Sequence, residues 1–151
     1  MEYIKQFDGY LLSTAKSQLD VDVIHHFLSE ESYWAKGVPR EIVEKSIAHS
    51  LCFGIYHSEN MVGFARMITD HATSAYLADV FILPGHRGKG LSKWMVQCIL
   101  EHPDLQGLRR MLLATRDAHG LYAQFGFTPL DAPEVFMQLH RPGVYASPES
   151  K

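Results

Sequence analysis

The hydrophobic and polar positions of the chain alternate with two periods, one typical of strands and one typical of helices. Short apolar runs predict strands over residues 10–13, 51–57, 61–70, 75–83, 108–114 and 134–139. Apolar residues at helical spacing predict four helices, two between the first and second strands and one after each of the fourth and fifth strands.

The helix ends are marked by residues that commonly start or stop helices. We expect Asp20 and Asp117 to cap the first and fourth helices, and Pro39 to open the second at its first turn. The third helix is predicted over residues 88–102, and Gly126 closes the fourth. The apolar residues expected to face inward, in helix order, are Val23, Ile24, Phe27 and Leu28; Ile42, Val43 and Ile47; Leu91, Trp94, Met95, Cys98 and Ile99; and Ala118, Leu121, Tyr122 and Phe125.

The order of these elements predicts the fold class. Hairpins join the strands of the first half, so antiparallel pairs are expected there, whereas strand–helix–strand connections in the second half favour parallel pairs. The prediction is therefore an α/β protein with a mixed sheet, in one domain over residues 1–151 with a loose tail at about residues 142–151.

The segment 84–92, Pro-Gly-His-Arg-Gly-Lys-Gly-Leu-Ser, lies between a predicted strand and a predicted helix. Free amides at a helix N-terminus bind anions, and glycines allow a phosphate to approach the backbone closely. Two nucleotide-binding motifs do not fit, because Leu91 stands where a phosphate loop needs lysine and Lys93 where a dinucleotide fingerprint needs its third glycine.

Two motifs resemble the GNAT acetyltransferase superfamily. Residues 87–92, Arg-Gly-Lys-Gly-Leu-Ser, are similar to its acyl-CoA motif Arg/Gln-x-x-Gly-x-Gly/Ala, with Ser92 in place of the last small residue. Residues 121–127, Leu-Tyr-Ala-Gln-Phe-Gly-Phe, resemble its second hallmark, LYxxxGF, although Thr115 stands where many members have asparagine. With the strand order, the resemblance covers nearly the whole chain and implies the GNAT-like acyl-CoA N-acyltransferase fold.

The resemblance also implies a reaction, in which an amine attacks the thioester of acetyl-CoA directly. It implies that the cofactor's pyrophosphate is held by the amides of Gly88, Lys89, Gly90, Leu91 and Ser92, with support from the side chains of Arg87 and Lys89. The backbone of Ile82 and Leu83 would pair with the pantetheine arm, and an amide there could polarise the thioester oxygen. Many members of the family are homodimers, so a homodimer is among the partners to expect.

Tyr122 and Asp79 are the two candidate catalytic residues. Tyr122 matches the family's frequent general acid, although packing with Leu121 and Phe125 would also explain it. Asp79 is a carboxylate inside an apolar strand, which would suit a general base. A continuous hairpin register around the turn 71–74 places Arg66 opposite Asp79, and this ion pair favours a structural or substrate-binding role.

Tyr33 and Trp34 occupy the predicted loop between the first two helices, where this family often shapes its acceptor pocket. Their rings could cover an apolar or cationic acceptor, or Trp34 could close the edge of the core. Arg66 and Tyr76 are further candidates for substrate binding.

Composition and charge exclude several other classes of protein. The chain has 14 Lys and Arg against 17 Asp and Glu, and this net charge of −3 argues against general nucleic-acid binding. Residues 80–116 nevertheless carry six basic and two acidic residues, which points weakly to an anionic ligand. No apolar run is long enough to span a membrane, and no secretory signal is evident.

The cysteines and histidines indicate neither a disulfide scaffold nor a metal centre. Cys52 and Cys98 suggest reduced thiols and a cytoplasmic protein. His25 and His26 are adjacent and point to different faces of a helix, so we expect no metal site. We therefore predict an acetyl-CoA-dependent N-acetyltransferase whose acceptor amine is small or belongs to a peptide or protein. The alternative is a non-catalytic module that binds acyl-CoA.

Overall fold

A six-stranded sheet forms the centre of the protein in the computed structural model, which describes residues 2–146. Its strands are β1 (Ile4–Phe7), β2 (Tyr10–Ser13), β3 (Leu51–His57), β4 (Asn60–Thr69), β5 (Ser74–Ile82) and β6 (Arg110–Leu113), arranged in that order. Successive strands are antiparallel except for the parallel pair β5–β6. The predicted mixed sheet and its division into an antiparallel and a parallel half are confirmed.

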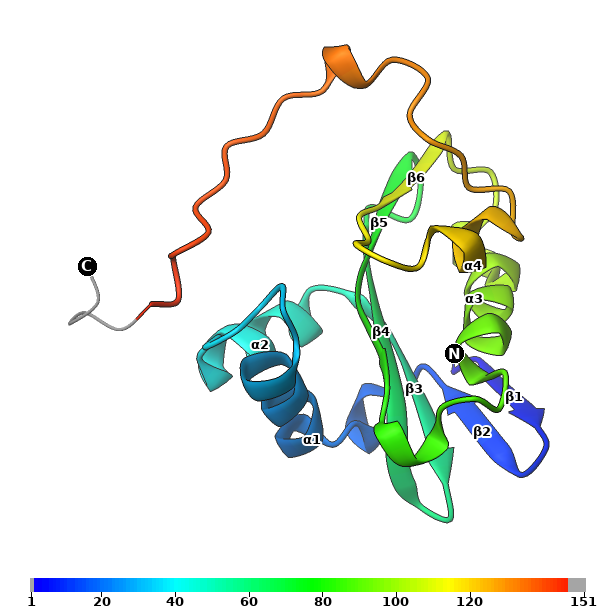
Figure 1. The fold of residues 1–151 in the computed structure, drawn as a ribbon. Helices are drawn as coiled ribbons and strands as arrows, with labels where there is room; N and C mark the ends of the chain where they lie inside the picture. Colours follow the sequence, from blue (N-terminus) through cyan, green and yellow to red (C-terminus); the bar gives the residue numbers. More distant parts are fainter. Residues whose placement is uncertain (1, 147–151) are drawn as a thin grey trace.

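Helices cover both faces of the sheet (Figure 1). Helices α1 (Val21–His26) and α2 (Arg40–Ala48) lie on one face, and α3 (Leu91–Glu101) and α4 (His119–Ala123) lie on the other. A π-helical turn, Phe27–Glu31, extends α1, and short 3₁₀ turns occur at Lys16–Gln18, Pro84–His86, Pro103–Leu105 and Pro133–Val135. Each face therefore has its own apolar core, one beneath α1 and α2 and one beneath α3 and α4.

The helix ends agree with the sequence pattern in part. Asp20 caps α1 as predicted, because its carboxylate accepts a hydrogen bond from the amide of Val23 (3.2 Å). The predicted cap at Asp117 is wrong, since the hydroxyl of Thr115 accepts the hydrogen bond from the Ala118 amide (3.1 Å) and α4 begins at His119. This hydrogen bond belongs to the turn that precedes α4, and no side chain caps the helix itself.

Two further expectations about the helices need correction. Ile42 is exposed rather than inward, because Val43 and Ile47 already fill the narrow buried stripe of α2. The third helix begins at Leu91 rather than at residue 88, because Gly88 and Gly90 have positive φ angles of 78° and 79°. A right-handed helix cannot contain such residues.

Strand β1 was absent from the sequence prediction. Its residues are exposed throughout, so the strand shows no apolar alternation. The dipeptide Asp8-Gly9, which joins β1 to β2 with positive φ at both residues, was the available signal for a hairpin.

The predicted last strand over residues 134–139 is wrong. This segment forms the 3₁₀ turn Pro133–Val135 and then irregular chain, and it pairs with no strand among the described residues. Val135, Met137 and Leu139 are 69%, 97% and 76% exposed, so the alternation that predicted a strand is not matched by burial against the described residues. Residues 147–151 of the predicted tail lie outside the described residues.

Candidate active site

The two parallel strands separate and open a cleft. Ser74–Leu77 of β5 pair with Arg110–Leu113 of β6, but β5 continues to Ile82 while β6 ends. A cleft of about 880 Å³ occupies the space beyond this point, between β5, the loop after α1 and helix α4. Nine of the residues singled out in the sequence line it: Tyr33, Trp34, Arg66, Tyr76, Asp79, Ile82, Arg87, Ser92 and Tyr122.

The turn between β5 and α3 presents free backbone amides. The first backbone hydrogen bond of α3 runs from the Trp94 amide to the Gly90 carbonyl (3.0 Å), and the amides of residues 88–93 donate to no described residue. No side chain caps this helix and its first turn has no acidic residue. The glycines at 88 and 90 are required by their positive φ angles, since other residues adopt this conformation at a cost of about 1–2 kcal/mol. The turn is therefore a positive helix terminus of the kind at which anions bind, with no acidic residue in the first turn of the helix.

A side-chain hydrogen bond of Arg87 connects this turn to the end of β5. Its Nε donates a hydrogen bond to the carbonyl of Ile82 (2.8 Å), and its side chain lines the cleft beside Ser92. The terminal guanidinium nitrogens make no hydrogen bond to described residues, so they can reach a ligand at the turn.

Ile82 and Leu83 present their backbone groups in opposite directions. The amide of Leu83 donates to the carbonyl of Val62 on β4 (2.8 Å), so this residue belongs to a hydrogen-bonded pair of the antiparallel ladder. Such pairs alternate with pairs whose N–H and C=O groups point away from the neighbouring strand. Ile82, opposite Gly63, is in that second position, and its carbonyl indeed meets Arg87 instead of β4. Ile82 therefore supplies the amide on the cleft side of β5, and Leu83 does not.

A β-bulge turns Asp79 toward the cleft. Phe64 pairs with Phe81, but Arg66 pairs with Ala78, so two residues of β5 oppose one residue of β4. Asp79 in this bulge has a φ of +55°, which aspartate tolerates better than most residues. The predicted register, with Arg66 directly opposite Asp79, is thus displaced by one residue at the bulge.

The ion pair between Arg66 and Asp79 is nevertheless confirmed. Nε of Arg66 lies 2.8 Å from Oδ2 of Asp79, and only 16% and 9% of the two side chains are exposed. The other carboxylate oxygen, Oδ1, accepts a hydrogen bond from Nε1 of Trp34 (2.9 Å). Arg66 also donates to the hydroxyl of Ser50 (3.1 Å). Both oxygens of Asp79 are therefore engaged by donors, which is the environment of a carboxylate that holds other side chains in place.

The loop that carries Tyr33 and Trp34 bridges the two sides of the cleft. Trp34 is hydrogen-bonded to Asp79 of β5. The hydroxyl of Tyr33 accepts a hydrogen bond from the amide of Arg116 (3.1 Å), which lies beyond the end of β6. The guanidinium of Arg116 lies 3.9 Å from the centre of the Tyr33 ring, and the two aromatic rings meet edge to face at 5.0 Å. The side chains of Tyr33 and Trp34 remain 46% and 42% exposed, so they form a wall of the cleft and do not close the core.

Tyr122 enters the cleft from the opposite side. It is 7% exposed and packs edge to face on Phe127 (5.8 Å). Burial raises the pKa of the Tyr122 hydroxyl above its ordinary value, and Tyr33 adds to the effect. Its hydroxyl has no hydrogen-bond partner among residues 2–146, so it is a protonated, uncommitted donor at neutral pH.

Arg116 and Tyr145 line the cleft but were not among the site residues predicted from the sequence. Arg116 was counted only as part of the basic segment, and Tyr145 lay in the predicted loose tail. Tyr145 is half-buried against the core beneath α1 and α2 and lines the cleft. No local pattern distinguishes Tyr145 from a tail residue, because the core that it packs against is formed by residues far away in sequence.

Comparison with known proteins agrees with this architecture. The sequence model of the Acetyltransferase (GNAT) family matches residues 15–127. The chain belongs to the GNAT acetyltransferase family. A candidate acetyltransferase of Gibberella zeae is 36% identical over 137 residues, which cover 76% of each chain.

Solved structures of GNAT proteins share the fold. The crystal structure of a candidate GNAT-family acetyltransferase from Xanthomonas campestris pv. campestris has 50% sequence identity and a TM-score of 0.91, and it covers 94% of this chain and all of that one. A candidate acetyltransferase from Clostridium acetobutylicum, solved with acetyl-CoA, matches with a TM-score of 0.61 at 12% identity, over 93% and 96% of the two chains. The second likeness concerns the fold alone.

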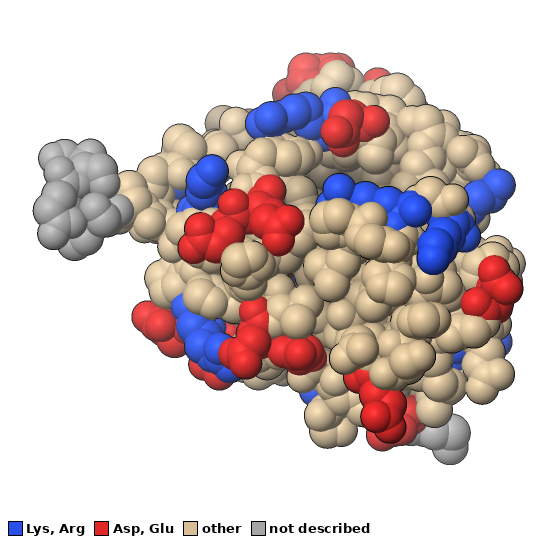
Figure 2. Space-filling view, turned by 60° about the horizontal axis from the view of Figure 1, so that its bottom comes forward, with Lys and Arg blue, Asp and Glu red and all other residues tan. Residues whose placement is uncertain are grey.

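Charge is distributed unevenly over the surface of this GNAT domain. Figure 2 shows a band of Lys and Arg side chains beside a hollow, while at other places on this face Asp and Glu side chains lie next to basic ones or in groups of their own. Three of the residues lining the cleft are arginines, Arg66, Arg87 and Arg116, and two are aspartates, Asp79 and Asp117. Since Asp79 is neutralised by Arg66, the free charge around the cleft is positive, as an anionic ligand requires.

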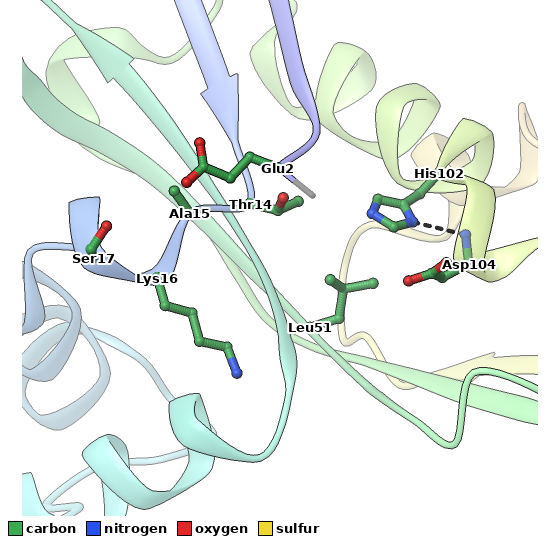
Figure 3. Close-up of a pocket in the computed structure, with 8 residues that line it drawn as sticks. All are labelled: Glu2, Thr14, Ala15, Lys16, Ser17, Leu51, His102 and Asp104. Atoms are coloured by element: carbon green, nitrogen blue, oxygen red, sulfur yellow. Dashed lines mark hydrogen bonds between the residues drawn. The ribbon is translucent and has the colours of Figure 1, made fainter.

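A second hollow, of about 590 Å³, lies between the start of the chain and the end of α3 (Figure 3). The buried His102 belongs to it, but Nδ1 of His102 accepts the amide of Asp104 (3.0 Å), and burial lowers the pKa of the imidazole. A neutral histidine that caps a 3₁₀ turn is a structural residue.

The described residues contain no group of three or more His, Cys, Asp or Glu side chains arranged to hold a metal ion. None of the helices over residues 2–146 is long and hydrophobic enough to span a bilayer.

Proposed function

We propose that this GNAT protein is an acetyl-CoA-dependent N-acetyltransferase that transfers the acetyl group to a primary amine by direct attack. The observation that carries the proposal is that Arg87 and Ser92, from the glycine turn, and Tyr122, from α4, line the same cleft. Acetyl-CoA would supply an activated thioester and a pyrophosphate by which it can be anchored.

The residues present fit such a ligand. The free amides of residues 88–93 lie at the N-terminus of α3, and the first turn of this helix has no acidic side chain that would compete with a phosphate. The space beside Gly88 and Gly90 is open, since a Cβ atom at either position would have no neighbouring atom within 4 Å. The amides of Gly88 to Ser92 would bind the pyrophosphate, with Arg87 and Lys89 adding positive charge.

The cleft-side amide of Ile82 is the group we assign to the thioester oxygen. Its direction follows from the ladder between β4 and β5, and the contact of Arg87 with the Ile82 carbonyl fixes this part of the strand. A preorganised amide in a partly dry site stabilises the negative charge that develops on that oxygen. In the proposed reaction the N–C bond forms as the C–S bond breaks.

Tyr122 would provide the proton for the leaving sulfur. Burial raises its pKa, so the phenol stays protonated over the physiological range and can donate to a thiolate. Asp79 is not assigned as the base, because both of its oxygens are already engaged. We propose that the proton of the amine passes to water and that Asp79 positions Trp34.

The aromatic wall of the cleft favours a cationic acceptor. Tyr33, Trp34 and Tyr76 are each about half exposed around the cleft, and aromatic faces attract ammonium groups. Arg66, being paired with Asp79, does not repel such an acceptor as a free guanidinium would. A primary amine that is protonated in solution is therefore the acceptor class that we propose.

The test is a thiol-release assay with acetyl-CoA and a panel of amines, combined with calorimetric titration of CoA. Release that depends on the amine, with CoA binding in the titration, supports the enzyme. CoA binding without release for any amine would leave a non-catalytic acyl-CoA-binding module. Absence of CoA binding would contradict both functions.

A further inference from the structure

Arg116 lies beyond the end of β6 and lines the cleft, but the acetyl transfer proposed above gives it no role. Its guanidinium forms no hydrogen bond and no ion pair with a residue of the described range 2–146. The other two arginines of the cleft differ from it, because Arg66 is paired with Asp79 and Arg87 is bonded to the end of β5 at the glycine turn. Arg116 is therefore a cation of the cleft wall that the described chain leaves without a partner.

Two contacts with Tyr33 hold Arg116 in place. The backbone amide of Arg116 donates to the Tyr33 hydroxyl (3.1 Å), and the guanidinium carbon lies 3.9 Å from the centre of the Tyr33 ring. The contact with the ring uses none of the guanidinium N–H donors, whose planar arrangement matches the two oxygens of a carboxylate. Because the arginine is already ordered, less conformational freedom is lost when a ligand binds to it.

The hydroxyl of Tyr33 is a second donor at the same place. Its oxygen accepts the hydrogen bond from the Arg116 amide, so its own proton remains available. This proton has no acceptor within the described part of the chain, and the Tyr33 side chain is 46% exposed in the cleft wall. The wall thus presents a neutral O–H donor together with a charged guanidinium, which is a suitable pair for one anionic group.

The two ends of the aromatic wall differ in what they attract. The rings of Tyr33 and Trp34 meet edge to face at 5.0 Å, and the Arg116 guanidinium lies at the Tyr33 end. An ammonium group is attracted to the aromatic faces but repelled by this guanidinium. A simple amine therefore suits only part of the wall, whereas an amine that also carries an anion suits all of it.

We propose that the acceptor is an amino acid, whose amine attacks the thioester while its carboxylate binds the guanidinium of Arg116 and the hydroxyl of Tyr33. The inference rests on the proposed function and adds the group by which the acceptor is recognised. The carboxylate takes no part in the bonds that form and break. It suits the site better than a phosphate does, because Arg116 supplies one positive charge and Asp117, which also lines the cleft, disfavours a second negative charge.

The activity test compares amino acids with their amides. Thiol release is measured for phenylalanine, lysine and γ-aminobutyrate and for the carboxamide of each, which keeps the size of the acceptor but removes its negative charge. At least one acid should exceed its amide in kcat/KM by about 10- to 100-fold, the usual effect of hydrogen bonds to a charged group. Arg116→Gln should bring this ratio close to one by raising KM for the acid and not KM for acetyl-CoA. Arg109→Gln removes an equal charge from an exposed position outside the cleft, so this matched control should leave the ratio unchanged.

Calorimetric titration of the N-acetylated products into the CoA-saturated protein tests the same contact without turnover. The N-acetylated form of the preferred acid should bind at least about tenfold more tightly than that of its amide, and Arg116→Gln should abolish the difference. This preference without thiol release for any acceptor would contradict the proposed transfer and support the carboxylate site. The inference is overturned if no acid is preferred in either measurement or if the preference survives Arg116→Gln. It is also overturned if Arg116→Gln raises KM for acetyl-CoA instead, because the guanidinium would then serve the phosphates of CoA.

Discussion

Removing the carboxylate of Asp79 tests whether this residue holds the cleft together or acts as a base. Its partner Arg66 is 16% exposed, so Asp79→Ala leaves a largely buried guanidinium with only the Ser50 hydroxyl as a described hydrogen-bond partner. Breaking a buried pair in this way costs about 3–5 kcal/mol. Alanine at a φ of +55° adds about 1 kcal/mol. The total is a large part of the 5–15 kcal/mol by which a domain is usually stable.

The assay is urea unfolding followed by circular dichroism at low temperature, where the variant retains enough folded protein to measure. Asp79→Asn is the matched variant, because asparagine tolerates positive φ and keeps one oxygen for Arg66 or Trp34; it should lose less stability than Asp79→Ala. The double variant Arg66→Met/Asp79→Ala removes the orphaned charge, so we expect it to be more stable than Asp79→Ala alone.

Kinetics separates the two roles. If Asp79 positions Trp34, Asp79→Asn should raise KM for the amine and leave the shape of the pH–rate profile unchanged. The reasoning is refuted if Asp79→Asn unfolds like the wild type, loses most of its kcat and no longer shows the acidic limb of the profile, because that combination identifies a general base.

Three further predictions concern the glycine turn, the proposed acid and the β4–β5 hairpin. Tyr122→Phe should lower kcat by about 10²-fold, because the proposed proton donor is lost. Its unfolding free energy should stay within about 0.5 kcal/mol of the wild type, since the Tyr122 hydroxyl bonds to no described residue. The distant Tyr3→Phe is the control for kcat, and an unchanged kcat in Tyr122→Phe would remove Tyr122 from the reaction. Ser92→Asp should stabilise α3 by about 0.3–1 kcal/mol, because an acidic side chain at the helix N-terminus interacts favourably with the helix dipole. The same substitution should raise KM for acetyl-CoA about tenfold, because the carboxylate repels a phosphate. Gln97→Glu, on the same helix, should not change KM, and an equal rise of KM in both variants would contradict an anion site at the turn. Hydrogen bonds from the Thr73 hydroxyl and from backbone amides hold the pKa of Asp70 well below its usual range. Its contribution to stability is therefore present above the ordinary aspartate value of about 4 and is lost as pH falls through the lower folded-state pKa. Urea unfolding of Asp70→Ala at neutral and strongly acid pH should show the difference from wild type shrinking in acid, and a constant difference would contradict this role.

The candidate site could be predicted where its residues are consecutive. Gly88 and Gly90 follow a strand and open a helix, so the turn and its free amides are local properties of the chain. Tyr122 could be predicted for the same reason, because the motif that identifies it consists of consecutive residues. The ion pair of Arg66 with Asp79 followed from hairpin register, and it formed even though the bulge displaced that register by one residue.

Residues that reach the cleft over long distances could not be predicted. The bond between Trp34 and Asp79 spans 45 residues, and that between Tyr33 and Arg116 spans 83. Which of the two amides, of Ile82 or of Leu83, faces away from β4 depends on the pairing between β4 and β5 beyond the bulge. Such contacts are decided by how the sheet is assembled.

The sequence by itself determined strands β2 to β6, the four helices, their order and the glycine turn before α3, because apolar periodicity, caps and positive-φ glycines act over a few residues. Only the tertiary structure decided that β5 and β6 separate to form the cleft, that Asp79 is fully engaged, and that residues 134–139 leave the sheet. The physical reason is that alternation specifies a face that must be buried but does not specify what buries it. In residues 134–139 the pattern of a strand is present, yet Val135, Met137 and Leu139 remain exposed in the described part of the chain.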